Sequence, residues 1–240
     1  MGETRVSRVD FGYFVRPAEE TGTGAPRVEP CLGYLVEQAD AVLLFDTGLG
    51  SDPSVDAHYR PRRRSLREAV SSAGHSLDAI THVANCHLHF DHCGGNPQLV
   101  GRPVFTQAVE LSTARNTVGY TLPQLLDAPG TRWEELDGQA QVLPGVTLIP
   151  TPGHTEGHQS LVVRRRDGVV VVAGQSHDSA SDYSADSLAL RAQRDGHAAE
   201  LPVAPEWLAR LEELDPSRVV FAHDHSVWEP GQRSRARRSS

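Results

Sequence analysis

Two short apolar segments form the first predicted strands of the chain. Residues 31–36 (CLGYLV) and 41–46 (AVLLFD) are rich in β-forming residues, and the polar stretch 37–40 lies between them. Runs of this length, bounded by polar residues, predict two strands joined as a hairpin. Residues 47–53 (TGLGSDP) are mostly turn formers, so the second strand is predicted to end there.

Helical and strand patterns then alternate. Residues 65–74 begin with a capping serine, have apolar positions at helical spacing and end in glycine, which predicts an amphipathic helix. The run at 169–173 is apolar on both faces and predicts a central strand. The remaining patterns predict strands at 79–85, 103–106, 146–149, 161–165 and 219–221, helices at 107–115 and 205–214, and loop with a short helix at 116–137. This order favours packed α/β layers over a helical bundle.

The length and the end of the chain suggest one domain. The 240 residues suit a single large domain, which we expect to cover residues 1–230. Residues 231–240 are rich in arginine and serine and have nothing to bury, so we expect a disordered basic tail.

Charge and cysteine content exclude several classes of protein. The net charge is −8 and every basic residue other than histidine is arginine, which disfavours binding to nucleic acid. No apolar run reaches the ~18 residues of a membrane-spanning helix. The first residues lack the pattern of an export signal, and Cys31, Cys86 and Cys93 cannot all pair with one another. We therefore expect a cytoplasmic protein with reduced thiols, without a nucleic-acid or membrane partner.

Histidines provide the first candidate chemistry. The chain has 12, and His87, His89 and His92 fall with Asp91 within six residues. On an extended segment, side chains at alternate positions point to one side, and the Gly-Gly pair at 94–95 would let the chain turn to bring in the last histidine. Imidazole and carboxylate are ligands that Zn²⁺ prefers, so the sequence predicts a zinc site here.

Apolar residues are interleaved with these ligands. We expect Leu88 and Phe90 to point back into the core. Cys86 and Cys93 flank the cluster, and thiolates can bind zinc, but we interpret both as packing residues.

Two later segments place single histidines directly after predicted strands. His154 lies in the Pro/Gly-rich turn 150–158, and His223 follows the last apolar strand. Loops at strand ends are where a rigid sheet assembles a site. We therefore expect both histidines to join the first cluster.

Together these motifs resemble the ligand motifs of the metallo-β-lactamase superfamily. The matching segments are HLHFDH at 87–92, TPGHTEGH at 151–158 and FAHD at 221–224, preceded by DTG at 46–48. The surrounding sequence is most similar to the N-acyl-homoserine lactonase branch. The resemblance implies a four-layer αββα sandwich in which two mixed β-sheets are flanked by helices, with a dinuclear zinc site at one edge.

The resemblance also implies the six metal ligands. They would be His87, His89 and His154 on one ion, and Asp91, His92 and His223 on the other. Asp46 and Asp224 each lie beside a motif, so we expect them to orient the imidazoles, and we expect His158 to be structural or to support the ligands from behind.

One expected ligand is missing. The family has an aspartate that bridges both metals where this chain has Gln175, and a neutral amide is a poorer bridge between two cations. Three outcomes are open. The second ion could bind more weakly, which we favour, or a hydroxide could bridge the metals without the carboxylate. Alternatively, His177, Asp178 or Asp182 could substitute for the missing aspartate. Three residues further on, the lactonases have a substrate-contacting tyrosine where this chain has Asp178, and Tyr183 could replace it.

The expected function is that of a zinc-dependent hydrolase. A metal-bound hydroxide would attack the carbonyl of a lactone, ester or thioester, and Asp91 would act catalytically by passing a proton to the leaving alkoxide. The substrate would be a small molecule, in a pocket roofed by residues 176–202 and 116–130. A homodimer is compatible with this fold. The alternative is a degenerate member of the fold with a non-hydrolytic biosynthetic or ligand-binding role, for which Gln175 is the best evidence.

Overall fold

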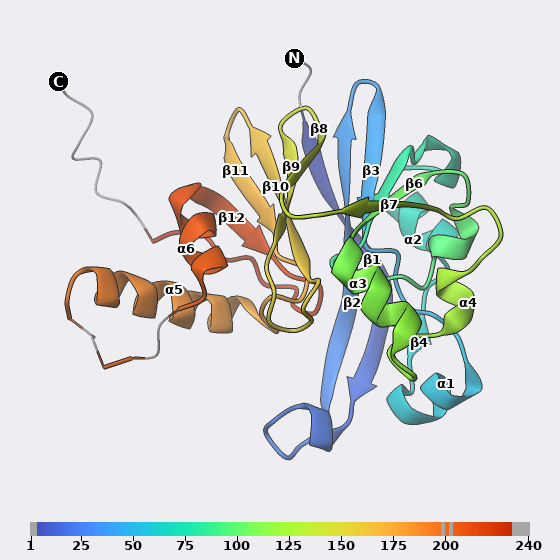
Figure 1. Cartoon of the computed structure of the whole chain (residues 1–240), viewed down its shortest axis with the longest axis horizontal. Helices are drawn as coiled ribbons and strands as arrows, with labels where there is room; N and C mark the ends of the chain where they lie inside the picture. The colour runs from blue at the N-terminus through green and yellow to red at the C-terminus, as the bar shows by residue number, and fades with distance from the viewer. Residues whose placement is uncertain (1–3, 198–199, 202–203, 232–240) are drawn as a thin grey trace.

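Two mixed β-sheets pack face to face in a computed structural model that describes residues 4–197, 200–201 and 204–231 (Figure 1). The larger sheet has, in spatial order, β4 (Arg62–Arg63), β1 (Arg5–Arg16), β2 (Arg27–Gln38), β3 (Ala41–Phe45), β5 (His82–Ala84), β6 (Pro103–Gln107) and β7 (Arg132–Leu136). The smaller has β12 (Pro216–Val220), β11 (Gly168–Val172), β10 (Gln159–Arg165), β9 (Val146–Pro150) and β8 (Ala140–Leu143). The predicted tail at 231–240 falls almost wholly outside the described residues.

Helices cover the outer face of each sheet. Figure 1 shows α5 and α6 against the smaller sheet, on the left, and the earlier helices around the larger one. The helices are α1 (Pro53–Tyr59), α2 (Leu66–Ser72), α3 (Ala108–Asn116), α4 (Pro123–Leu126), α5 (Ala180–Arg194) and α6 (Glu206–Glu213). Short 3-10 turns occur at Ala18–Glu20, Leu77–Ala79 and Asn96–Gln98. The predicted four-layer αββα arrangement is therefore confirmed.

Strand β2 explains why the two sheets stack. Leu32, Tyr34 and Val36 alternate along it and join the apolar core between the sheets. Cys31 and Leu35 point the other way, into the core beneath α2. Both faces of a central strand are thus buried, as its nearly continuous apolar sequence requires.

Most predicted elements are present, with ends shifted by a few residues. Helix α2 begins as expected at Ser65, which forms a capping box with Glu68. Strand β11 lies inside the smaller sheet, between β10 and β12, as predicted for the valine run. The strand predicted over 79–85 is shorter, because the 3-10 turn at Leu77–Ala79 occupies its start.

Several elements were not predicted, and the largest difference concerns residues 176–202. This segment was expected to roof the pocket as a loop, yet it contains α5, which packs on the smaller sheet through Tyr183 and Leu190. Only a few positions of α5 are buried, so its Ser, Asp and Ala composition hid the helical pattern. The other unpredicted elements are β1, β4, α1, β7, β8 and the short 3-10 turns.

The sheet topology brings distant segments to one edge. Strand β3 runs parallel to β5, and β11 runs parallel to β12. Parallel strands end at the same edge of a sheet, so the loops after them lie side by side. The loops after β5 and β12 carry five of the six candidate ligands, and the sixth, His154, follows β9.

Among the described residues, none of the helices is both long and apolar enough to cross a bilayer.

Candidate metal centre

Three imidazoles converge from the loops after β5 and β9. Nε2 of His87 lies 2.9 Å from Nδ1 of His89, and Nε2 of His154 lies 3.3 Å from that same Nδ1. Ligand atoms on a tetrahedral zinc ion with zinc–nitrogen bonds of 2.0–2.1 Å are about 3.3 Å apart. The three nitrogen atoms, which we call the histidine half-site, are therefore spaced to hold one such ion.

A second group lies beside it. Oδ2 of Asp91 is 3.3 Å from Nε2 of His92 and 3.4 Å from Nε2 of His223. The two Nε2 atoms are 3.2 Å apart, and all three residues are buried. These atoms, which we call the carboxylate half-site, are also spaced for one metal ion, and the structure thus brings all six predicted ligands together in two groups.

The loop that carries four of these ligands is not extended. It turns tightly, with the backbone N–H of His92 donating to the carbonyl of His89. Alternation along a strand therefore does not explain the convergence. Leu88 is buried as predicted, whereas Phe90 is only partly buried: it packs against the same apolar cluster as Leu88 and also lines a cavity.

The glycine pair after the ligands serves close packing. Neither Gly94 nor Gly95 has a positive φ, contrary to the expectation that they supply an unusual turn. A Cβ atom on Gly94 would lie 2.1 Å from the backbone nitrogen of Gly50. The ligand loop can thus approach the Asp46-Thr47-Gly48 loop only because no side chain is present.

Asp46 fixes the orientation of one ligand. Its Oδ2 accepts a hydrogen bond from Nδ1 of His92 at 3.0 Å, and its Oδ1 accepts one from the backbone N–H of Cys86 at 2.8 Å. With Nδ1 bonded to Asp46, Nε2 is the ring atom that faces the carboxylate half-site and could bind a metal ion. Asp46 has φ 63, a left-handed conformation that is uncommon outside glycine and that aspartate tolerates better than most residues.

His223 is oriented by the main chain, and Asp224 has a different role from the one expected. Nδ1 of His223 donates to the carbonyl of Pro30 at 2.9 Å, which directs Nε2 into the site. Asp224 instead accepts hydrogen bonds from the backbone N–H groups of Ala180 and Ser226. It therefore anchors the start of α5 and contacts none of the ligand imidazoles.

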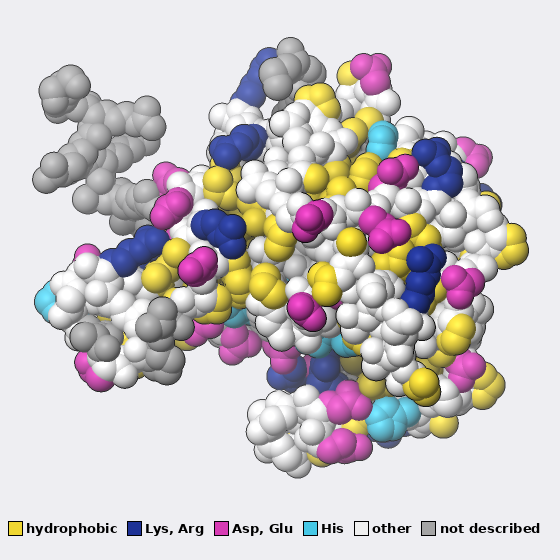
Figure 2. Space-filling model, viewed as in Figure 1, with side chains coloured by type: hydrophobic (Ala, Val, Ile, Leu, Met, Phe, Trp, Pro, Cys, Tyr) yellow, Lys and Arg dark blue, Asp and Glu magenta, His cyan; other side chains and the backbone are white. Residues whose placement is uncertain are grey.

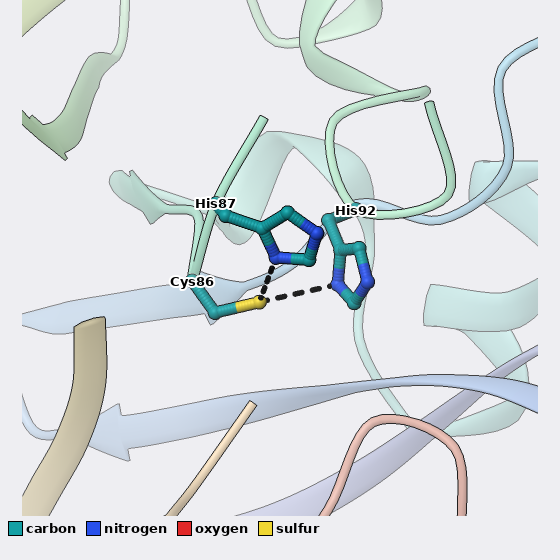
Figure 3. Close-up of side chains that lie close together, drawn as sticks. All are labelled: Cys86, His87 and His92. Carbon is teal, nitrogen blue, oxygen red and sulfur yellow. Dashed lines mark hydrogen bonds between the residues drawn. The ribbon is translucent and has the colours of Figure 1, made fainter. Parts of the chain in front are cut away.

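Cys86 lies behind two ligands (Figure 3). Its Sγ is 3.1 Å from Nδ1 of His87 and 3.2 Å from Nδ1 of His92, on the side of each ring opposite the Nε2 atoms. These three residues could form a third metal group by distance alone. Burial raises the pKa of the Cys86 thiol far above neutrality, so the sulfur supports the imidazoles and is a poor metal ligand.

His158 supports the loop that carries Gln175. Its Nδ1 donates to the carbonyl of Thr151 at 3.0 Å, and its Nε2 accepts the backbone N–H of Gln175 at 3.1 Å. Both ring nitrogens are thus occupied, and burial keeps the pKa of the ring well below its usual value. The ring is a neutral support behind the site, as expected from its position in the motif.

Gln175 itself faces the ligands. Its Oε1 lies 3.2 Å from Nε2 of His92, and the buried side chain also lines the cavity. The amide oxygen therefore occupies the side of the carboxylate half-site where a further ligand would stand.

The proposed substitutes for this position lie elsewhere. His177 packs against Trp207, and its Nε2 lies 3.3 Å from Asp186. Asp178 pairs with Arg27 at 2.6 Å, and Asp182 accepts from the hydroxyl of Ser179. None of the three contacts a ligand among the described residues.

Tyr183 points away from the site as well. Its ring is fully buried between Phe221 and Trp228, and its hydroxyl donates to Glu212 at 3.1 Å. It belongs to the core beneath α5, because α5 is a helix on the outer face of the sheet and not a loop over the cavity. A role as a substrate contact is therefore inconsistent with its position.

Glu110 is a site residue that the sequence analysis missed. This buried carboxylate accepts hydrogen bonds from the backbone N–H of Leu88, the hydroxyl of Tyr120 and the hydroxyl of Thr155. It thereby ties together two loops that carry the histidine half-site. It lies on α3, far in sequence from every ligand motif, so no local signal marked it.

The histidine half-site carries neutral rings. Burial, with His92 and His89 nearby, lowers the pKa of His87 well below its ordinary value. Burial also lowers the pKa of His89. Their lone pairs are therefore available near pH 7.

The carboxylate half-site is charged. Burial alone would lower the pKa of His92, but the carboxylates of Asp91 and Asp46 raise it well above its ordinary value. Burial would raise the pKa of Asp91, but His92 and His223 lower it far below its ordinary value. A metal ion held here would have to displace the proton on His92.

A cavity of about 530 Å³ opens onto both half-sites. Phe14, Tyr59, Phe90, Leu122 and Val55 form its apolar wall; the polar lining includes Arg16, Glu20, His89, Asp91, Tyr120, Thr121, His154 and Gln175. Figure 2 shows dark-blue basic side chains beside cyan histidines in the hollow between the body of the molecule and the loop at the bottom of the view. This volume suits a small molecule.

The sequence profile of the metallo-beta-lactamase superfamily matches residues 26–223. The chain belongs to this superfamily. An N-acyl homoserine lactonase from Bacillus sp is 27% identical over 212 residues, which cover 81% of this chain and 81% of that protein. The N-acyl homoserine lactonase AiiA of Bacillus thuringiensis subsp. kurstaki is 31% identical over 147 residues, or 56% of this chain and 58% of that protein.

Solved structures of superfamily members have the same fold. An N-acyl homoserine lactone hydrolase with N-hexanoyl-L-homoserine at its catalytic metal centre superposes with a TM-score of 0.73 at 22% identity, covering 94% of this chain and 95% of that one. AidC, a dizinc quorum-quenching lactonase, gives 0.67 at 17% identity, covering 93% and 88%. The sequence matches confirm the predicted superfamily and the class of metal-dependent hydrolase, and the solved structures confirm the predicted fold.

Proposed function

We propose that this protein is a zinc-dependent hydrolase that cleaves the carbonyl of a lactone or of a related ester or thioester. The observation that carries the proposal is the convergence of six ligand atoms, in two groups of three, at the base of one cavity. The names of the relatives, N-acyl homoserine lactonases, support a small lactone as the substrate class.

The donor set fits zinc. Five imidazole nitrogens and one carboxylate oxygen are borderline to hard ligands, and their separations of 2.9–3.4 Å suit tetrahedral sites. The histidine half-site would hold one ion and the carboxylate half-site the other. When bound, the zinc ions would polarise the substrate carbonyl and lower the pKa of water at the site.

Asp91 is the residue we assign to proton transfer. Its Oδ2 faces His92 and His223, whereas no described residue forms a hydrogen bond with its Oδ1, and the residue lines the cavity. In this proposal Oδ1 would take the proton from the water that attacks the carbonyl and would deliver it to the leaving alkoxide.

Gln175 makes the two ions unequal in this proposal. Its amide oxygen brings no negative charge to the carboxylate half-site, and the proton on His92 competes with metal there. We therefore propose that the ion in the carboxylate half-site binds more weakly than the ion in the histidine half-site. The same residue favours the second candidate function, a non-hydrolytic member of the fold that binds a ligand without cleaving it.

The proposal also includes five predictions from the sequence: a cytoplasmic location, a homodimer, no nucleic-acid partner, no membrane partner, and a single domain over residues 1–230.

The test combines metal analysis with hydrolysis. Protein purified without chelator and supplied with zinc is expected to hold two ions per chain and to hydrolyse acyl lactones. His89→Ala should lose one ion and lower kcat/KM about a thousandfold, since a metal ion contributes several kcal/mol to such a reaction. His75→Ala is the matched control, because His75 pairs with Glu37 and does not line the cavity.

Two results would contradict the proposal. Protein that binds no zinc would exclude the metal site. Protein that binds two zinc ions but cleaves no lactone, ester or thioester in a panel of acyl chains would instead support the non-hydrolytic alternative.

A further inference from the structure

Strand β1 delivers an arginine to the cavity. Phe14 and Arg16 are two residues apart near the end of β1, so their side chains leave the strand on the same face. Both line the cavity together with His89, Asp91 and Gln175. The guanidinium also lies over the Phe14 ring, 5.7 Å from its centre. A permanent positive charge therefore stands in the same chamber as both half-sites.

The arginine is held rigidly from behind. Nε and Nη2 of Arg16 donate to the two carboxylate oxygens of Glu29, each at 2.7 Å. The Arg16 side chain is 13% exposed and that of Glu29 only 3%. On the outer side, Arg27 pairs with Glu29 and with Asp178, and neither Arg27 nor Glu29 lines the cavity.

This arrangement leaves part of the guanidinium available. The fork to Glu29 uses Nε and Nη2, and within the described part of the chain no acceptor is hydrogen-bonded to Nη1. An arginine needed only to stabilise the fold would not have to border the cavity, because Glu29 already has Arg27 as a partner. We propose that Arg16 is a specificity-determining residue that binds a carboxylate on the substrate, so that the preferred substrates are anionic.

The chemistry of the chamber suits such a molecule. A guanidinium recognises a carboxylate through charge-assisted hydrogen bonds. The apolar wall of Phe14, Tyr59 and Phe90 would receive the carbon skeleton between the carboxylate and the scissile carbonyl. Gln175 leaves the base of the chamber with one negative charge fewer than an aspartate would, which also favours an anion. This inference rests on the proposed hydrolase function.

The experiment compares two series of substrates. Acyl homoserine lactones whose acyl chains end in a carboxylate are matched with otherwise identical carboxamides, at three chain lengths. Zinc-loaded wild-type protein is expected to prefer the carboxylate at one of these lengths by about ten- to hundredfold in kcat/KM. Arg16→Gln should abolish this preference by slowing the carboxylate and leaving the carboxamide nearly unchanged.

Control variants separate recognition from folding. Arg27→Gln removes the other arginine that pairs with Glu29 and should keep the preference, because Arg27 does not line the cavity. Arg16→Lys keeps the positive charge but not the two-pronged guanidinium, and it should keep part of the preference for the carboxylate. If Arg16→Gln does not fold because Glu29 is left without its main partner, the double variant Arg16→Gln/Glu29→Gln removes both charges and should show the same loss.

The outcomes separate this inference from the proposed function. Turnover of both series at equal rates by the wild type, or an equal loss on both in Arg16→Gln, would overturn the role of Arg16 and leave the hydrolase intact. If neither series is hydrolysed, calorimetric titration of the same lactones decides. If the wild type binds the carboxylate lactone more tightly than the carboxamide and Arg16→Gln loses this difference, the result would support the recognition site although the hydrolase proposal had failed. If the two lactones bind equally, the role of Arg16 would be overturned.

Discussion

The two half-sites use different means to hold what we propose to be the same kind of ion. The histidine half-site consists of three imidazoles, of which His87 is buried and His154 is exposed. The carboxylate half-site is buried throughout and pairs Asp91, whose pKa is lowered, with His92, whose pKa is raised. The histidine half-site can therefore bind a cation without losing a proton, whereas in the carboxylate half-site a cation competes with the proton on His92.

The residues behind the two half-sites differ in the same way. Asp46 contacts a ligand ring directly, through Nδ1 of His92. Glu110 contacts no ligand ring and holds the backbone of Leu88 and the hydroxyl of Thr155, next to the ligands. Direct support sets the tautomer and the charge of a ligand, while indirect support sets only its position. Changes of pH or of the supporting residues should therefore alter the zinc affinities of the two half-sites to different extents.

Acidification is expected to have the largest differential effect. Zinc must displace a proton from His92, whose pKa is raised well above its ordinary value, so affinity at the carboxylate half-site should fall as the pH falls. Where the free His92 ring is protonated, the loss should approach about tenfold for each pH unit. The histidine half-site should change little, because the pKa values of His87 and His89 are lowered.

Competition with a chromogenic chelator measures these affinities. His223→Ala isolates the histidine half-site and His87→Ala isolates the carboxylate half-site. Parallel pH curves for the two variants would refute the difference in protonation.

Replacing the supporting carboxylates should come next in size. In Asp46→Asn a single amide oxygen must serve both the N–H of Cys86 and Nδ1 of His92, so zinc affinity at the carboxylate half-site should drop about ten- to hundredfold. Glu110→Gln should change zinc affinity less and lower the free energy of unfolding by about 1–3 kcal/mol, because three donors lose a charged acceptor.

Zinc titration and urea denaturation of both variants provide the measurements. Equal losses of zinc affinity in the two variants would argue against direct support by Asp46.

Restoring a carboxylate should have the smallest effect and reduce the difference between the half-sites. Gln175→Asp places a negative charge beside His92 and should tighten zinc binding at the carboxylate half-site by about tenfold. Gln175→Asn is the matched control, being of the same size but neutral. The number of zinc ions retained after dialysis at limiting zinc reports the result, and equal retention in the two variants would show that the charge at this position is unimportant.

The ligand set was largely readable from the sequence because each ligand has a local signal. His87 to His92 fall within six residues, and His154 and His223 each follow an apolar strand. The strand-end position implies a shared edge once the sheets form, so the prediction needed no knowledge of their packing. Asp46 was marked in the same way, at the end of β3.

The sequence patterns alone determined the α/β class of the fold and the candidate ligands, because strand patterns and histidine spacing are local properties. The resemblance to the superfamily added the four-layer sandwich and the departure at Gln175. The tertiary structure decided that Tyr183 lies in the core, that Glu110 supports the histidine loops, and that Arg16 reaches the cavity. These roles depend on contacts between residues far apart in the chain, and an isolated charged or aromatic residue has no periodicity that reveals its partner.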